Sequence, residues 1–170
     1  MRPVRRFADN VSDQLDAGEG LRFTGDVGTG KTTLAMLVSK TALDEGRSVA
    51  IYSMPKLLAH IRRTYEASPE DDTYSNFFDR LTSVDLLHID DMGAARQTDW
   101  VLEQLYSIVN ERYEAERSIV FTTNVSGGKM EDRLKEVESQ VGKRTFSRLA
   151  EMCGDPVLLF GQDLRYSQAV

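Results

Sequence analysis

Residues 25–32 carry the residue types that hold a phosphate chain. They read Gly-Asp-Val-Gly-Thr-Gly-Lys-Thr and satisfy the pattern G-x-x-x-x-G-K-[ST] in full. Glycines let the backbone curl so that successive N–H groups point inward, and Lys31 would place its ammonium on the outer phosphates. The Thr32 hydroxyl suits Mg²⁺. The predicted phosphate-binding residues are Gly25, Asp26, Val27, Gly28, Thr29, Gly30, Lys31, Thr32 and Thr33.

Two adjacent carboxylates, Asp90 and Asp91, follow the apolar run 84–89. The first could hold Mg²⁺ through its waters, and the second could polarise a water for attack on a γ-phosphate. Adjacent acids at a strand end are also common in solvated turns. Because these follow both a phosphate loop and an apolar run, we interpret Asp90 as a metal ligand and Asp91 as a catalytic acid.

Asn124 ends a further apolar run, 118–123. At the tip of a neighbouring strand, its amide could orient the attacking water or contact the γ-phosphate. The alternative is a turn formed with Ser126, Gly127 and Gly128, which are residue types common in turns. We favour the catalytic interpretation because the other two runs end in the same chemistry.

Arg144 and Arg148 lie four residues apart within the predicted helix 142–153, so they project from nearly one face. In an isolated ATPase they would be ordinary surface charges. In an oligomer, an arginine here could reach the γ-phosphate of a neighbouring copy. The residue types alone leave both interpretations open.

These residues need a scaffold of alternating strands and helices. Short apolar runs with β-branched residues occupy 21–24, 48–53, 84–89, 118–123 and 156–160, and longer stretches with helical spacing separate them. Nearly all-apolar strands between helices predict an α/β fold with a parallel sheet covered on both faces. The acidic stretch 68–75 is predicted to be a solvated loop between two helices.

Composition narrows the classes of protein. The 170 residues suit one domain, and the net charge of −6 means that any nucleic-acid contact needs a local basic patch or an assembly.

No run approaches the roughly 18 apolar residues of a membrane span, and no apolar stretch follows the basic N-terminus as in a secretory signal. A single cysteine suits a reducing cytosol, and 2 histidines argue against a transition-metal site. We expect a cytoplasmic protein without a membrane partner.

Four stretches together resemble the AAA+ ATPase core of the bacterial DnaC/DnaI-type replicative helicase loaders, and the closely similar IstB-type transposition helper ATPases. They are GLRFTGDVGTGKTTLA, LLHIDDMG, LYSIVNERYEAERSIVFTTN with a preceding tryptophan, and GKRTFSRLAEM. The Asp-Asp form of the second is more specific than the phosphate loop, because most other AAA+ families have Glu after Asp. The resemblance covers nearly all of the chain. It implies a P-loop NTPase fold, with an AAA+ core whose five-stranded parallel sheet lies between helices.

The resemblance also implies roles for particular residues. Lys31 and Thr32 would be the Walker A contacts to ATP and Mg²⁺, and Asp90 and Asp91 would form Walker B, with Asp91 positioning the water. Further roles would be sensor 1 for Asn124, arginine finger for Arg148 and a helper for Arg144. Trp100 and Arg112 also match the family pattern, and we interpret both as structural because they lie on the helix that packs beside the sheet.

Helicase loaders usually carry an N-terminal domain that grips the helicase. We expect residues 1–20 to be a lead-in and residues 21–170 to be the AAA+ domain, with no room for a second domain and no helical lid after the last strand. The chain would then be a truncated core, or its client would differ.

Family members bind ATP to assemble on DNA or on a partner machine, and single-stranded DNA is a usual ligand. The candidate nucleic-acid contacts are Lys56, Arg62 and Arg63, with Tyr52 and Tyr65 as stacking partners. A solvated helix face is the alternative.

The sequence therefore predicts a self-associating ATPase switch in DNA replication that binds single-stranded DNA or a helicase partner. The first alternative is a transposition helper with a transposase as its partner. A second is a nucleotide-dependent scaffold that does not hydrolyse ATP. The third is a small P-loop kinase, but the acidic stretch 68–75 is a poor lid and the paired acids fit water activation better.

Overall fold

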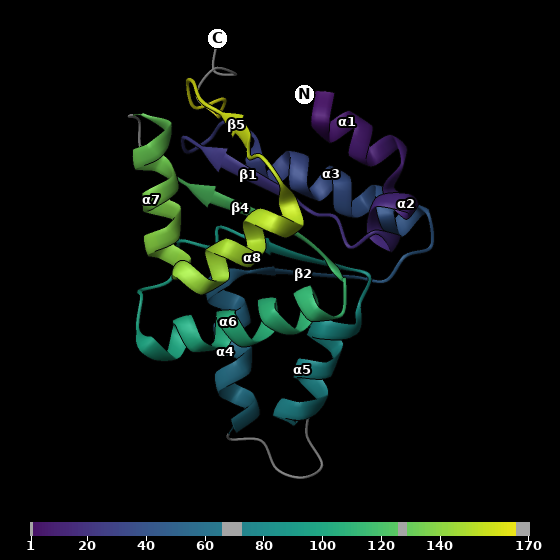
Figure 1. Cartoon of the computed structure of the whole chain (residues 1–170). Helices are drawn as coiled ribbons and strands as arrows, with labels where there is room; N and C mark the ends of the chain where they lie inside the picture. Colours follow the sequence, from purple (N-terminus) through teal and green to yellow (C-terminus); the bar gives the residue numbers. More distant parts are fainter. Residues whose placement is uncertain (1, 66–72, 126–128, 166–170) are drawn as a thin grey trace.

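The computed structural model describes residues 2–65, 73–125 and 129–165. Its centre is a five-stranded sheet in the order β2-β3-β4-β1-β5, and every neighbouring pair of strands is parallel (Figure 1). The strands are β1 (Leu21–Gly25), β2 (Val49–Ser53), β3 (Leu86–Asp90), β4 (Ser118–Asn124) and β5 (Val157–Leu159). The predicted α/β class and parallel five-stranded sheet are confirmed.

The three central strands are buried almost throughout, whereas β2, at one edge, is half-exposed along its length. This explains why the sequence of the central strands is nearly continuous apolar residues rather than an alternating pattern. Polar residues lie at the carboxyl ends of these strands. The register of the sheet places Gly25, at the end of β1, level with Asn124, at the end of β4.

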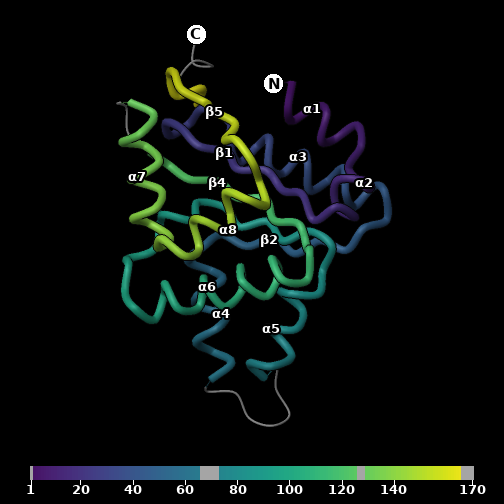
Figure 2. Tube along the Cα trace, viewed as in Figure 1, coloured from purple at the N-terminus to yellow at the C-terminus, as the bar shows by residue number. Residues whose placement is uncertain are grey.

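Helices cover both faces of the sheet. One face packs against α1 (Arg2–Asp9), α2 (Val11–Asp16) and α3 (Lys31–Asp44). The other packs against α4 (Met54–Tyr65), α5 (Tyr74–Ser83), α6 (Asp99–Glu114) and α8 (Lys143–Cys153). Helix α7 (Met130–Val141) packs on α8, and Figure 2 shows α4 and α5 projecting together beyond the β2 edge.

Residues 1–20, which we expected to be a lead-in, contain α1 and α2 and contribute to the core. Val4, Phe7, Val11 and Leu15 are buried against α3 and β1. Their spacing is a weak helical signal, and these helices of eight and six residues depend on tertiary packing for their stability. The predicted loop 68–75 lies mostly outside the described residues, and Tyr74 and Ser75 belong to α5, which Thr73 caps.

Arg112 has the structural role that we expected. Its guanidinium is fully buried and donates to the backbone carbonyls of Leu81, Thr82, Asp85 and Ser118. Burial lowers its pKa to about 9, which leaves it charged at neutral pH. The side chain thus ties the end of α5 to the starts of β3 and β4. Trp100, also expected to be structural, is half-buried against the core.

Candidate nucleotide-binding site

The loop between β1 and α3 has the conformation that a phosphate-binding loop needs. Gly28 and Gly30 have φ values of 77° and 91°, in the left-handed region that only glycine adopts at little cost. Gly30 is also the N-cap of α3, so the first turn of this helix directs its unpaired N–H groups toward the loop. The sequence pattern therefore predicted the local structure correctly.

Lys31, the first residue of α3, is buried beneath this loop. Its ammonium donates to the carbonyl oxygens of Gly25, at 3.0 Å, and of Asp26. Burial lowers the pKa of Lys31, and the nearby carboxylates of Asp91, Asp26 and Asp90 act in the opposite direction. The lysine is thus held at the loop by backbone carbonyls, where its charge can act on a phosphate.

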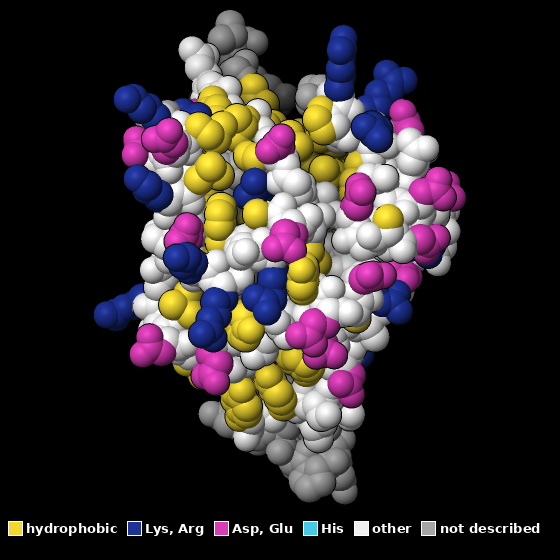
Figure 3. All heavy atoms as spheres, in the orientation of Figure 1, with side chains coloured by type: hydrophobic (Ala, Val, Ile, Leu, Met, Phe, Trp, Pro, Cys, Tyr) yellow, Lys and Arg dark blue, Asp and Glu magenta, His cyan; other side chains and the backbone are white. Residues whose placement is uncertain are grey.

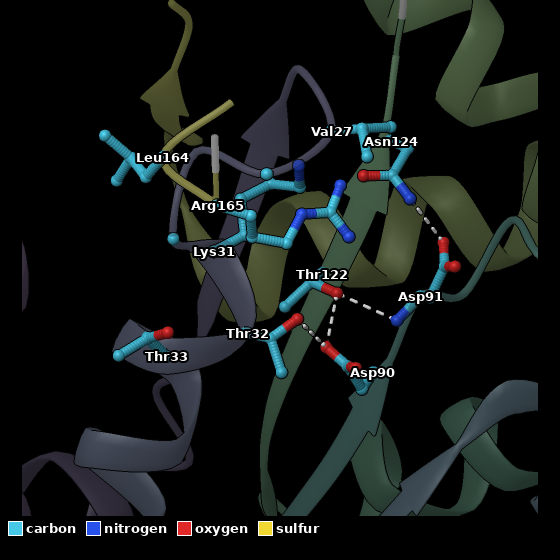
Figure 4. A pocket seen from close by; sticks show the side chains of 12 residues that line it. Val27, Lys31, Thr32, Thr33, Asp90, Asp91, Thr122, Asn124, Leu164 and Arg165 are labelled. Carbon is cyan, nitrogen blue, oxygen red and sulfur yellow. Dashed lines mark hydrogen bonds between the residues drawn. The ribbon is translucent and has the colours of Figure 1, made fainter. Parts of the chain in front are cut away.

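Thr32 and Asp90 lie next to each other, as the prediction of a shared metal required. The Thr32 hydroxyl donates to Oδ1 of Asp90 at 2.9 Å, joining the first turn of α3 to the end of β3 (Figure 4). A hydroxyl and a carboxylate are hard oxygen donors of the kind that Mg²⁺ takes beside nucleotide phosphates. This donor set fits Mg²⁺.

Asp91 begins the turn after β3 with a φ of 52°, which is uncommon for a residue other than glycine. Its Oδ1 accepts a 2.8 Å hydrogen bond from the side-chain amide of Asn124. Burial and the neighbouring Asp90 raise the pKa of Asp91, while Asn124 and Lys31 lower it by less. A carboxylate with a raised pKa beside a polar amide has the properties of a general base.

Thr122, which was not predicted from the sequence, connects the two acids. Its hydroxyl donates to Oδ1 of Asp90 at 2.8 Å and accepts the backbone N–H of Asp91, also at 2.8 Å. The bonds come from the neighbouring strand β4 (Figure 4). The available signal was its position two residues before Asn124, which puts both side chains on the same face of the strand.

These groups line one cavity of about 550 Å³. Of the predicted phosphate-binding residues, Val27, Gly28, Gly30, Lys31, Thr32 and Thr33 line it, and so do Asp90, Asp91 and Asn124. Gly25, Asp26 and Thr29 do not. Instead, the carbonyls of Gly25 and Asp26 accept from Lys31, and the Thr29 hydroxyl donates to the Asp26 carbonyl.

Leu164 and Arg165 also line this cavity, although neither was predicted from the sequence. No motif marks them, because only the path of the chain after β5 brings them to the loop.

Arg148 is not among the residues that line the cavity of its own chain. Its guanidinium lies over the rings of Tyr106 and Tyr113 on α6, at 5.0 and 5.5 Å from their centroids. It also donates to the Arg144 carbonyl at 3.5 Å. The role of Arg148 as an arginine finger remains a prediction.

The candidate nucleic-acid residues Lys56, Arg62 and Arg63 are exposed on α4. Arg62 lies over the Trp100 ring at 4.7 Å. The ring of Tyr65 stacks on that of Tyr74. Because Tyr65 is still 53% exposed, it remains accessible to a base.

Tyr52 instead packs half-buried against His60 and Phe77, so it is poorly placed as a stacking partner for a base. On the face drawn in Figure 3, basic and acidic side chains intermingle and no broad area has a single sign.

In the part of the chain that the structure describes, His, Cys, Asp and Glu form no group of three or more that could hold a metal ion. Its helices also include none that is long and apolar enough to cross a membrane.

Comparison with known proteins agrees with this site. The family model described as "IstB-like ATP binding protein" matches residues 10–153. The replicative helicase loader DnaC of Escherichia coli K12 is 26% identical over 146 residues, covering 86% of this chain and 53% of that protein. The uncharacterized protein YdaV of the same strain is 28% identical over 130 residues, covering 76% and 51%. The chain thus spans about half the length of these relatives.

Solved structures agree on the fold. A crystal structure of the DnaC helicase loader superposes with a TM-score of 0.78 at 26% identity, covering 94% of this chain and 86% of that one. The structure of AMPPCP-bound DnaA from Aquifex aeolicus superposes with a TM-score of 0.70 at 22% identity, covering 94% of this chain and 44% of that one. At this identity, the likeness concerns the fold alone. The chain matches a DnaC-type AAA+ core, and it belongs to the IstB-like ATP-binding protein family.

Proposed function

We propose that this chain binds MgATP and hydrolyses it to ADP and phosphate. The observation that carries the proposal is the pairing of the Asp91 carboxylate with the Asn124 amide, 2.8 Å apart, beside the Thr32–Asp90 pair at the mouth of the phosphate loop. A site that only holds nucleotide does not need a carboxylate with a raised pKa next to an orienting amide.

In the proposed reaction, the N–H groups of the loop and the Lys31 ammonium hold the β- and γ-phosphates. Thr32 and Asp90 would hold Mg²⁺, which supplies charge stabilisation to the phosphate oxygens when it is bound. Asp91 and Asn124 orient a water whose oxygen bonds to the γ-phosphorus as the bond to the bridging oxygen breaks. The proton released by the water passes to Asp91, and ADP is the leaving group.

We propose further that a second copy of the chain completes the site with Arg148. The support is that Arg148 does not line its own cavity, while its guanidinium is held by tyrosine rings on the packed surface of α6 and α8. An arginine whose orientation is fixed in advance loses little side-chain entropy when it meets a phosphate. Self-association would then be part of the enzyme's mechanism.

The proposed client is a replicative helicase, and the proposed process is DNA replication, because relatives of this core are named as replicative helicase loaders. Single-stranded DNA would bind at Lys56, Arg62 and Arg63 on α4, next to the exposed ring of Tyr65. A client of this kind would place the chain in the cytoplasm. We retain residues 21–170 as the AAA+ domain, which α1 and α2 complete structurally.

A transposition helper is the second candidate, favoured by the description of the matching family model. Capture experiments with the full chain in the presence of MgATP separate the two: recovery of a replicative helicase supports the first candidate, and recovery of a transposase supports the second.

Phosphate release tests the proposed reaction. The assay is run over a range of protein concentrations, with and without single-stranded DNA. Turnover that rises more than linearly with protein concentration is expected. ATP-dependent assembly with no phosphate release would instead support the scaffold alternative.

A further inference from the structure

The segment that follows β5, residues 161–165, lies across the phosphate loop. The Asp26 N–H donates to the Leu159 carbonyl at 3.0 Å, and the Gly161 N–H donates to Oδ2 of Asp26 at 3.2 Å. Farther along, the Leu164 N–H donates to the Gly28 carbonyl at 3.0 Å. The segment is therefore attached to the loop at both of its ends.

The fit between loop and segment is close at Gly28. A Cβ built on this glycine would lie 2.0 Å from Oδ1 of Asp163, closer than two such atoms can approach. Glycine at this position thus serves two purposes, since it allows the left-handed φ and leaves room for the carboxylate. This contact places Asp163 directly against the phosphate loop.

Asp163 in turn orients Arg165. The guanidinium donates through Nε at 2.9 and 3.1 Å to the two carboxylate oxygens, and through Nη2 to Oδ2 at 2.5 Å. Arg165 also lines the nucleotide cavity, as Figure 4 shows. A two-point pair of this kind fixes the plane and direction of the guanidinium.

A cation at this position would balance the negative charge around the cavity. Within the described ranges, the basic side chains that line it are Lys31 and Arg165, and the acidic ones are Asp90 and Asp91. An ATP polyphosphate adds several negative charges at this place. A planar guanidinium matches the geometry of phosphate oxygens better than an ammonium does.

We propose that Arg165 is a nucleotide-binding residue that contacts the phosphates of ATP bound in the same chain, with Asp163 as its positioning residue. This rests on the proposed function, because it requires MgATP on the phosphate loop. Arg165 would thus add a second cation to Lys31 within the same chain, before a second copy supplies Arg148.

The test is a double-mutant cycle on the full chain, with affinity for MgATP measured by calorimetry. Arg165→Gln is expected to weaken binding by about tenfold or more, the usual effect of losing a charge-assisted hydrogen bond. Arg165→Lys, which keeps the charge without the planar fork, is expected to lie between that variant and the wild type. Thermal melting of each variant checks that it is folded.

The double variant Asp163→Asn/Arg165→Gln separates contact from simple neutralisation. If Arg165 contacts phosphate, the double variant binds no better than Arg165→Gln. If Arg165 only neutralises Asp163 beside the loop, removing both charges restores wild-type affinity and the inference is wrong. Wild-type affinity in Arg165→Gln alone would also overturn it.

Arg5→Gln is the matched control, since Arg5 also pairs with a nearby aspartate, Asp9, but on α1 and away from the cavity. Its affinity for MgATP should equal that of the wild type. A wild-type chain that bound no MgATP would refute the proposed function itself, and this outcome is distinct from failure of the cycle.

Discussion

The hydroxyl of Thr122 donates a 2.8 Å hydrogen bond to Oδ1 of Asp90, the same carboxylate oxygen that accepts from Thr32. The same hydroxyl accepts a hydrogen bond from the backbone N–H of Asp91. This bond holds the backbone where Asp91 adopts its left-handed φ of 52°. Thr122 therefore determines how the two acids diverge, with Asp90 directed toward α3 and Asp91 toward Asn124. Thr122 can therefore affect the rate by positioning Asp90 and Asp91.

Thr122→Val keeps the shape of the side chain and removes the hydroxyl. We expect kcat for ATP hydrolysis to fall by about tenfold or more, because misplacing catalytic groups by a fraction of an ångström is costly, while MgATP affinity changes little. Thr122→Ser should restore most of the rate. Steady-state kinetics with separate binding measurements give both quantities.

Thr123→Val is the matched control. The Thr123 hydroxyl pairs with Thr24, away from the acids, so this variant should retain its rate per folded molecule. Equal losses in Thr122→Val and Thr123→Val would mean that β4 had simply been destabilised.

Lys31→Ala should abolish MgATP affinity, since it removes the ammonium at the centre of the phosphate loop. Calorimetry on the full chain measures this directly. Lys40→Ala is a suitable control, because Lys40 lies on the same helix and pairs with Asp44 on the surface. Unchanged binding in Lys31→Ala would show that the phosphate site is elsewhere.

Asp91→Asn should retain MgATP and lose turnover by about a hundredfold or more, because the group that accepts the proton of the water is removed.

The raised pKa of Asp91 also leads to an expectation about the stability of the same variant. An acid whose folded pKa lies above its unfolded value disfavours the folded state once the pH rises above both. We therefore expect Asp91→Asn to melt at or above the temperature of the wild type at neutral pH.

The pH series provides the check on this prediction. The stability advantage of Asp91→Asn should vanish as the pH falls below the unfolded pKa of Asp91, because both states then carry the proton. A variant that melted lower at neutral pH, or that hydrolysed ATP at the wild-type rate, would contradict the assignment.

Arg148→Ala should bind nucleotide normally and lose the part of turnover that depends on protein concentration, as a residue supplied by a second copy would. Lys143→Ala, on the first turn of the same helix, controls for loss of positive charge on α8. Light scattering establishes whether the variant still assembles. Normal activity of Arg148→Ala at every concentration would rule out the finger.

Arg112→Met should destabilise the fold by about 3 kcal/mol or more, because it leaves the backbone carbonyls of Leu81, Asp85 and Ser118 without their donor. Chemical unfolding measures the loss. Arg117→Met removes a partly exposed arginine that pairs with Asp85, and it should cost about 1 kcal/mol or less. Similar losses in the two variants would argue against a structural role for Arg112.

The sequence by itself determined the elements whose chemistry is local. The phosphate loop, its lysine and the acids at the end of β3 are readable because glycine conformation, helix N-termini and strand ends depend on neighbours along the chain. The parallel sheet was predictable for the same reason, since continuous apolar runs separated by helical spacing leave few alternatives.

Only the tertiary structure decided which distant groups meet. The order of the sheet puts β4 beside β3, and this brings Thr122 to Asp90 and Asn124 to Asp91. The path after β5 carries Asp163 and Arg165 to the phosphate loop, and packing against α3 makes short helices of residues 2–16. Such contacts join segments far apart in the chain. They depend on strand order, register and packing volume, which no local pattern of residues encodes.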